Sequence, residues 1–497
     1  MSTIMNHISQ NKKSVLFSIL LLSAAAILVK IKPAGLLTGD TLNKAIQIQA
    51  VIDNNFRSAA LSCDTSKPLQ SCEFLPPEFR LYGDAVHGPF PVFLSYLAAP
   101  FVKFFGLTVI PWLSLLIFFL SIYLLNKKWE LHWSILAFSF LATPWYIHAL
   151  GFIDVSISNL FVVLVMSLLT VDKNRVNPWL YAPYAAAFWL RPETAILLAL
   201  IIALVFFHNR PSDLRPVYYS SLWFLGGLTL YFLINFHTSG SILGPRILYN
   251  QSEIGMFSLQ KISNLVSLLF YGDMRFGYFG FVPLFGLLYF IVVKRYTDLP
   301  VTYKILGISS ILYIVTAAVL SPNNSNIDWG TRYFSITLPV NIVIINFLLK
   351  NFYLNSSGKA LRLAAALLFA YSLSINLMAV KIYKNSSRQI KSVQDFFNKQ
   401  DTPVWVFSDV ITFGHIGIEY FGKRALFIKD ENEMKKVMAA LTEQKRPFSY
   451  FHPLQVPSSL PDSDKVEISD YTPVFSKKFK KTGSDHFMIF RAENFTP

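Results

Sequence analysis

Long apolar stretches separated by short charged segments dominate the first 380 residues. A helix that crosses a membrane needs about 20 mostly apolar residues, and shorter stretches cross when they tilt or pack against other helices. Ten stretches qualify: Ser14–Ile31, Leu107–Leu125, Leu131–Leu150, Val155–Val171, Ala195–Phe207, Val217–Phe236, Phe276–Val293, Tyr303–Leu320, Tyr333–Leu349 and Leu361–Val380. An eleventh, Pro178–Leu190, predicts a short helix that meets Ala195–Phe207 at one membrane face.

The segment Pro89–Gly106 is apolar enough to cross but carries three prolines and Lys103. Lysine and arginine collect in cytoplasmic loops, so the charged loops decide where this segment lies. If it stays on the surface, six basic pairs share the side of the N-terminus: Lys12/Lys13, Lys127/Lys128, Lys173/Arg175, Arg210/Arg215, Lys294/Arg295 and Lys359/Arg362. We therefore predict 11 crossings, a cytoplasmic N-terminus and Pro89–Gly106 along the outer interface. Lys30 and Lys32, at the outer end of the first crossing, are exceptions whose side chains must snorkel.

The tail from Lys381 to Pro497 differs in composition and predicts a small extracytoplasmic α/β domain. Its expected strands are Val404–Phe407, Ala425–Ile428 and Phe448–Phe451, its expected helices are Ile411–Phe421 and Glu431–Glu443, and Val474–Phe479 with His486–Phe490 form a closing hairpin. The predicted organisation is thus a transmembrane domain over residues 1–380, whose first outer loop is 33–106, and a second domain over 381–497.

Composition supports a polytopic α-helical membrane protein. Apolar residues make up 53% of the chain, charged residues only 15%, and the mean hydropathy is +0.44. Soluble domains carry about 25% charged residues, so a soluble multidomain enzyme is disfavoured. The net charge of +15 is interpreted as a topology signal, and no nucleic-acid partner is expected. The two cysteines, Cys63 and Cys72, fall in the same outer loop, where an oxidising compartment permits a disulfide.

Acidic and basic residues near helix ends collect on the predicted outer side. Asp40 opens a helical stretch that extends to about Phe56; the helix N-cap alone would explain an acid here, but the other residues of this loop favour a functional acid. Lys44 follows one turn later, and His87 lies in a turn-forming His-Gly-Pro element of the same loop. Asp154 begins a later helix, where the helix dipole alone accounts for an acid.

Charged residues at the junction of two short membrane helices are costly unless they pair or serve a function. Arg191-Pro192-Glu193 is therefore a stronger indication of a functional site than Asp154. Three further outer arginines lie near membrane boundaries: Arg246, Arg275 and Arg332. Anchoring to lipid phosphate explains each one alone. Together with Lys44 they are also suited to bind a phosphate or pyrophosphate, because a guanidinium presents a fork of donors.

This order of elements resembles the GT-C superfamily, whose members are integral-membrane glycosyltransferases that use polyprenyl-phosphate sugars, such as the aminoarabinose and protein mannosyl transferases. The resemblance covers roughly Ser14–Leu349. It rests on an outer acid after the first helix, a His-Gly-Pro element, a second outer acid and an Arg-Pro-Glu junction. It implies that Asp40 and Asp154 match the catalytic acids, while Arg191 and Arg332 match the basic residues at the helix junction and before a late helix. Two departures are that Gly88 replaces a proline and that Asp40 lacks an acidic neighbour, which weakens the case for a metal cofactor.

The expected mechanism is a single inverting displacement. Asp40 accepts the proton of an acceptor hydroxyl, and the polyprenyl phosphate leaves under stabilisation by arginines without a metal. The partners are then a polyprenyl-phosphate-linked sugar, membrane lipid, and a glycan, lipid or protein acceptor, on the extracytoplasmic face of a bacterial inner membrane. Two alternatives stay open: a transporter or lipid flippase, and a membrane scaffold or sensor that acts through its outer tail.

Overall fold

The computed structural model describes residues 2–61, 75, 78–82, 85–151, 153–169, 177–208, 214–244, 259–272, 275–321, 330–353, 359–453, 472–480 and 489–496. The chain divides into two compact units. Unit 1 takes residues 1–30, 110–234 and 250–383, and unit 2 takes residues 31–109, 235–249 and 384–497. The expected disulfide between Cys63 and Cys72 lies outside the described residues and stays a prediction.

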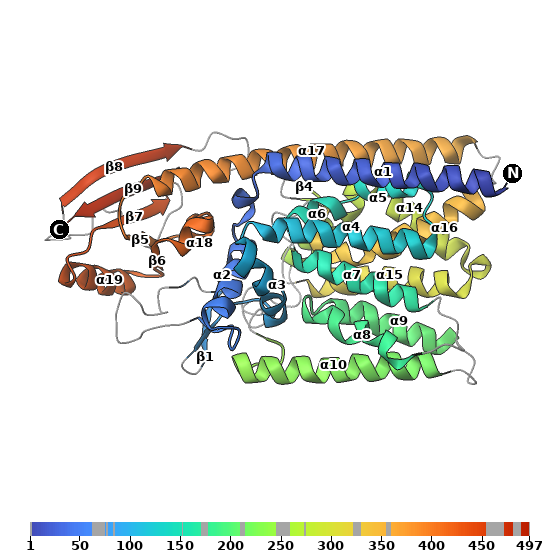
Figure 1. Ribbon diagram of the computed structural model, residues 1–497, viewed down its shortest axis with the longest axis horizontal. Helices are drawn as coiled ribbons and strands as arrows, with labels where there is room; N and C mark the ends of the chain where they lie inside the picture. The colour runs from blue at the N-terminus through green and yellow to red at the C-terminus, as the bar shows by residue number, and fades with distance from the viewer. Residues whose placement is uncertain are drawn as a thin grey trace. The chain divides into compact units, whose positions relative to one another are not determined.

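Unit 1 is built mainly of helices (Figure 1). Its longer helices are α1 (Ser2–Ile31), α4 (Val109–Trp129), α5 (Trp133–Leu141), α6 (Trp145–Gly151), α7 (Ile153–Leu168), α9 (Thr194–His208), α10 (Arg215–Ser239), α12 (Leu259–Leu269), α14 (Pro283–Lys294), α15 (Val301–Leu320), α16 (Leu338–Leu348) and α17 (Lys359–Asn398). Shorter elements are η5 (Pro178–Tyr181), α8 (Pro183–Ala186), η6 (Ala187–Trp189), β3 (Tyr271–Gly272), β4 (Arg275–Phe276), α13 (Tyr278–Phe281), η7 (Tyr296–Asp298), η8 (Arg332–Thr337) and η9 (Leu349–Tyr353). The last residues of α1, α10 and α17 and the first of α4 belong to unit 2.

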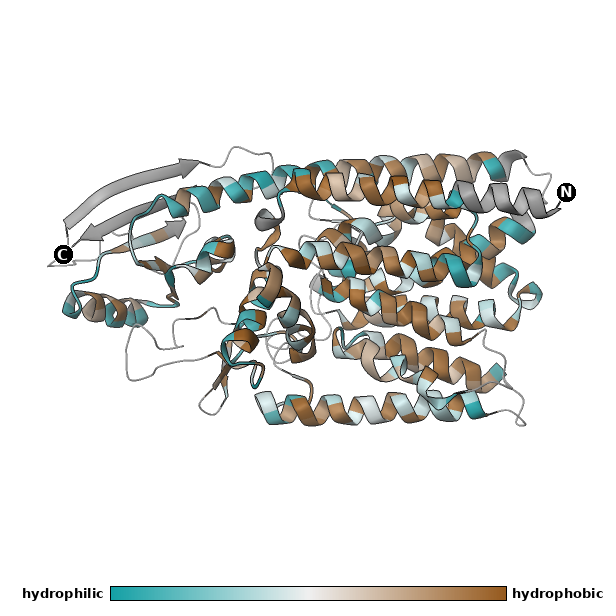
Figure 2. Cartoon of the chain, in the orientation of Figure 1, coloured by the Kyte–Doolittle hydropathy of each residue, from teal (hydrophilic) through white to brown (hydrophobic). Residues whose placement is uncertain are grey.

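Among the described residues, six helices are long and apolar enough to cross a membrane. They are Lys13–Ile31, Val109–Trp129, Arg215–Ser239, Val301–Leu320, Arg332–Asn351 and Arg362–Asn398. A seventh results if α5 and α6, bent by 47°, form one span. The predicted crossings Val155–Val171, Ala195–Phe207 and Phe276–Val293 correspond to the shorter apolar helices α7, α9 and α14. The chain is therefore a mostly helical protein with the long apolar helices of a membrane protein (Figure 2), while the count of 11 stays a prediction.

Prolines account for the interruptions of the predicted apolar stretches. Proline has no backbone N–H and disfavours helical conformation in the residue before it. Pro144 lies in the break between α5 and α6, and Pro283 begins α14 directly after the break at Val282. The expected single helix Pro178–Leu190 is wrong in detail, because the segment is divided into η5, α8 and η6, and Pro183 begins α8 directly after the first break.

Unit 2 combines the first loop with the C-terminal tail. The loop forms η1 (Pro33–Leu36), α2 (Asp40–Asp53), the hairpin β1 (Arg80–Tyr82) and β2 (Ala85–His87), and α3 (Val92–Phe105). The tail forms β5 (Val404–Phe407), α18 (Val410–Gly414), η10 (Gly417–Phe421), β6 (Arg424–Phe427), α19 (Glu431–Glu443), β7 (Phe448–Pro453), β8 (Thr472–Lys480) and β9 (Ile489–Thr496). The five strands of the tail form one sheet in the order β6-β5-β7-β9-β8, in which β5 is parallel to β6 and β7 and the other pairings are antiparallel.

The two faces of this sheet have different cores. Because strand side chains alternate between faces, Val404 and Val406 pack with α19 on one face. Trp405 and Phe407 point to the other face, where Leu42 of α2 joins their cluster. The first loop, which the sequence places with the transmembrane domain, therefore shares a hydrophobic core with the tail.

We expect Gly417→Ala to destabilise unit 2. Gly417 has a φ of +63°, and an added Cβ would overlap Nε2 of the buried Gln394. Left-handed strain costs about 1–2 kcal/mol, and overpacking of a buried site adds about 1–3 kcal/mol. Thermal unfolding of the full chain in detergent should show a lower midpoint. Gly422→Ala is the matched control, because Gly422 has no positive φ and its nearest contact for a Cβ is 3.8 Å away; an equal loss in both variants would contradict the argument.

Candidate functional site

Two predicted residues of the first loop, Asp40 and Lys44, lie on one face of α2 in unit 2 together with Gln47. Asp40, Lys44 and Gln47 are spaced by four and three residues, which places them on the same side of the helix. Lys44 is buried, with 3% of its surface exposed, and its ammonium lies 4.7 Å from the centre of the Phe90 ring. A cation over an aromatic face is attracted by the ring quadrupole, so Phe90 supports a charge that is otherwise costly to bury.

Asp40 is not the N-cap of α2, which is the structural explanation that the sequence offered for it. Gly39 takes the N-cap position with a φ of 49° and has no side chain to cap the helix. Asp40 is instead the first helical residue, where its charge complements the helix dipole. The backbone N–H of Gly39 donates to the carbonyl of Gly414 in α18 at 3.0 Å. The tail therefore fixes the backbone directly before Asp40.

Hydrogen bonds of Gln47 connect α2 to the segment directly after the His-Gly-Pro element. Its amide nitrogen donates to the carbonyl of Phe90 at 3.0 Å, and its amide oxygen accepts from the N–H of Phe90 at 3.1 Å. A Cβ at Gly88 would overlap the Gln47 side chain, so this position needs a glycine. Sequence reasoning missed Gln47, although its spacing from Asp40 and Lys44 was the available signal.

His87 ends β2 and is partly buried beside this turn. Its Nδ1 is buried and has no hydrogen-bond partner within the described part of the chain. Burial lowers the pKa of the imidazole below its ordinary value of 6.5, so the neutral form is favoured. The first loop thus offers a carboxylate, an ammonium and a neutral imidazole within one unit.

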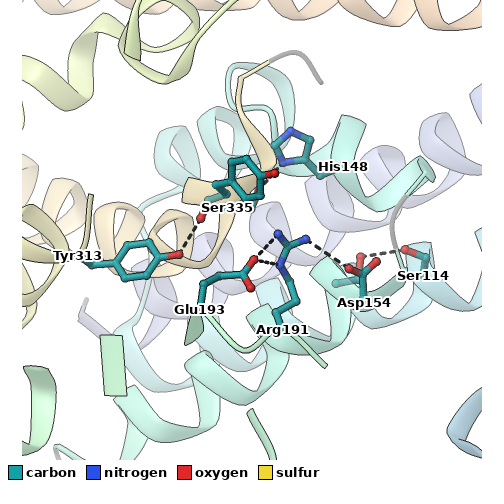
Figure 3. A network of polar contacts seen from close by, with 9 residues as sticks. Ser114, His148, Asp154, Arg191, Glu193, Tyr313 and Ser335 are labelled. Carbon is teal, nitrogen blue, oxygen red and sulfur yellow. Dashed lines mark hydrogen bonds and ion pairs between the residues drawn. The ribbon is translucent and has the colours of Figure 1, made fainter. Parts of the chain in front are cut away.

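A second group of predicted residues forms a buried ionic centre in unit 1 (Figure 3). Arg191, 6% exposed, lies between η6 and α9. Its Nη1 donates to Oδ2 of Asp154 at 3.3 Å, its Nε donates to Oε1 of Glu193 at 2.7 Å, and its Nη2 also pairs with that carboxylate. The positive charge of Arg332 is close enough to oppose that of Arg191. Two carboxylates and two guanidiniums therefore share this region of unit 1.

Further polar groups lie near the ionic centre (Figure 3). His148 of α6 and Ser335 of η8 are joined by a 2.5 Å hydrogen bond between Nδ1 and Oγ, and Tyr313 donates to the carbonyl of Tyr333 at 2.7 Å (Figure 3). These bonds connect α6, α15 and η8. Sequence reasoning did not assign His148 or Ser335, because a single histidine in an apolar helix carries no pattern.

The backbone before Arg332 is strained. Gly330 has a φ of 74° and Thr331 a φ of 52°, which is unusual for a β-branched residue. The Thr331 hydroxyl donates to the carbonyl of Leu268 at 2.7 Å, and the N–H of Gly330 donates to the carbonyl of Phe276 at 2.8 Å. The second bond brings the loop of Arg275 beside the loop of Arg332, and strain of this kind is often found at functional sites.

The structure thus gathers the predicted residues into two sets, each within one unit. Asp40, Lys44 and His87 belong to unit 2. The set in unit 1 comprises Asp154, Arg191, Glu193, Arg275 and Arg332. Arg246 lies outside the described residues. Among the residues that the structure describes, no group of three His, Cys, Asp or Glu side chains is arranged to bind a metal ion.

No protein-family model matches the chain, and no curated protein matches it either.

We expect the stability of unit 2 to fall as the pH drops below about 6.5, because of His87. Above this pH both folded and unfolded states hold a neutral imidazole. Below it the unfolded chain binds a proton that the buried imidazole resists, so the unfolding free energy decreases until the pH reaches the lower pKa of the folded state. Thermal midpoints from pH 8 to 5 should decline less steeply in His87→Gln. His237→Gln, at an exposed position, is the control, and parallel pH profiles for wild type and His87→Gln would contradict the prediction.

Proposed function

We propose that this protein is an integral-membrane glycosyltransferase that moves a sugar from a polyprenyl-phosphate donor to an extracytoplasmic acceptor. The acceptor is a glycan, a lipid or a protein. The observation that carries the proposal is the buried Arg191 centre, whose positive charge is opposed by that of Arg332. A charged group inside a helical membrane protein is expensive and is retained mainly where it is used.

Arg191 is suited to stabilise a leaving phosphate. Two carboxylates hold its guanidinium, so the group does not need to reorganise when negative charge develops. Arg332 and Arg275 contribute further positive charge in unit 1. A phosphate is a good leaving group once its charge is stabilised, and the reaction then needs neither a general acid nor a metal.

Asp40 is assigned as the general base. In the proposed inverting displacement its carboxylate accepts the proton of the acceptor hydroxyl while that oxygen attacks the anomeric carbon. Its position at the first residue of α2 and the bond between Gly39 and Gly414 fix its backbone. Lys44, Gln47 and His87 lie in the same unit, and we assign Lys44 and His87 to substrate binding.

Asp154 was expected as a second catalytic acid. Its carboxylate is paired with Arg191 and 90% buried, so we propose that it positions Arg191 and does not take the acceptor proton. Glu193 shares the positioning role from the other side of the guanidinium.

The proposed setting follows from the charge pattern of the loops. The 11-crossing topology places the N-terminus in the cytoplasm, and it places the loop 33–106 and the tail 381–497 outside a bacterial inner membrane.

A transporter or lipid flippase is the second candidate. The buried ion pairs and the bent pair of α5 and α6 favour it, because interrupted helices and intramembrane charges are common in transporters. One measurement distinguishes the two functions, because only a transferase releases polyprenyl phosphate from a polyprenyl-phosphate sugar.

We expect Asp40→Asn to lower the rate of sugar transfer by a factor of about 10² to 10⁴, the usual contribution of a general base. Asparagine keeps the shape of the side chain, and the loss of a charge at a helix start costs only about 0.3–1 kcal/mol. Release of polyprenyl phosphate from a panel of polyprenyl-phosphate hexoses and pentoses is measured in membranes and normalised to protein amount. Asp53→Asn, at the exposed end of the same helix, is the control and should stay near wild type. Near-wild-type transfer by Asp40→Asn would rule out Asp40 as the base, and no release by the wild type would contradict the function.

Asp154→Asn should reduce the maximal rate more than the affinity for the acceptor, because the mispositioned Arg191 no longer stabilises the leaving phosphate. Arg191→Lys should behave in the same way, since lysine keeps the charge but cannot bond two carboxylates as a planar fork. The matched control is Asp298→Asn, because Asp298 forms an exposed pair with Arg295 at the same 3.3 Å distance. If Asp154→Asn and Asp298→Asn gave equal rates, the positioning role would be wrong.

A further inference from the structure

Three basic residues that the proposed function does not use lie together in unit 2. The hydroxyl of Ser387, in α17, donates to the carbonyl of Ile31 at 2.6 Å and to that of Lys32 at 3.3 Å. These bonds satisfy carbonyls that the end of α1 leaves without helical partners. Lys384 precedes Ser387 by one helical turn, and Arg388 directly follows it. Lys32, Lys384 and Arg388 are named the basic cluster below.

The basic cluster has no acidic partner among the described residues. Lys32 and Arg388 are exposed, Lys384 is half-buried, and none of the three forms an ion pair there. The next cation of α17 differs, because Lys391 pairs with Asp395 and lies near Glu419. Like charges one helical turn apart repel each other, so the cluster is unfavourable until an anion binds.

Lys32 is also held in a conformation that lysine rarely adopts. Its φ is 62°, in the left-handed region where glycine and asparagine are preferred at the end of a helix. Gly35 follows closely, and its N–H donates to the carbonyl of Lys32 at 2.9 Å. A residue that breaks a local rule in this way often serves a function through its side chain.

The cluster lies where the lipid-facing surface of each helix ends. The last exposed large apolar residue of α1 is Val29, and that of α17 is Ile382. Figure 2 shows α17 changing along its length from hydrophobic to hydrophilic. Cations directly beyond an exposed apolar surface are at the depth of lipid phosphates.

We propose that Lys32, Lys384 and Arg388 bind the phosphate headgroup of an acidic phospholipid at the membrane surface. The site explains why Lys32 departs from the charge pattern that otherwise orients the loops. It uses none of the residues assigned to sugar transfer and does not depend on the proposed function.

The test compares lipid binding by the full chain in detergent, measured by native mass spectrometry with phosphatidylglycerol and with phosphatidylcholine. The variant combines Lys32→Asn, which tolerates the positive φ, with Lys384→Gln and Arg388→Gln. Each basic residue near a membrane surface contributes about fivefold in affinity, so the preference for phosphatidylglycerol should fall by on the order of 100-fold. Arg388→Gln alone, at an exposed position, should lose about fivefold.

The matched control combines Lys445→Asn, Lys399→Gln and Lys436→Gln. It removes the same charge from exposed positions of unit 2, and Lys445 also has a positive φ, of 47°. The proposal requires the control to keep the preference for phosphatidylglycerol. Retained preference in the cluster variants, or an equal loss in the control, would overturn it. Displacement of the lipid by soluble glycerol phosphate at equal concentration would also overturn it, because the cluster would then be a site for soluble anions.

Discussion

The buried guanidinium of Arg191 constrains how the helices of unit 1 are arranged. A charge with 6% exposure must be paired, and its partners come from α7 and from the residue two positions away. The same requirement applies to the other buried polar groups near it, and His148 and Ser335 form a hydrogen bond with each other. A few polar contacts therefore fix the relative orientation of helices whose surfaces are otherwise mostly apolar.

Unit 2 depends on a different constraint, the shared hydrophobic core between a loop and a tail. Leu42 and Ile46 of α2 pack with Trp405 and Phe407 of β5, far away in the sequence. The burial of these aromatic side chains fixes the opposite face of α2, which carries Asp40, Lys44 and Gln47. The tail therefore supports the backbone of the candidate base, which gives this domain a physical role in the proposed reaction.

The sequence predicted elements well where the signal is local. β5 and α19 begin and end at the expected residues, because the short apolar run Val404–Phe407 and the charged helix pattern of Glu431–Glu443 are local signals that need no distant partner. The segment Pro178–Leu190 is a case where the prediction was less accurate. Its apolar composition predicted one helix, but Pro183 within it begins a new short helix. The N-cap of α2 is Gly39 and not the alternative Asp40, and the sequence does not reveal this because the bond from Gly39 to Gly414 joins distant segments.

By itself the sequence determined that the chain is rich in apolar helices and that acids and arginines stand at their ends, because hydrophobicity and helix boundaries are properties of short segments. Only the tertiary structure decided which of these charges meet. Asp154 pairs with Arg191, 37 positions away in the sequence, and Gln47 forms a hydrogen bond with Phe90, 43 positions away. Such contacts depend on how whole helices pack, and packing is set by the sum of many weak interactions that no local pattern records.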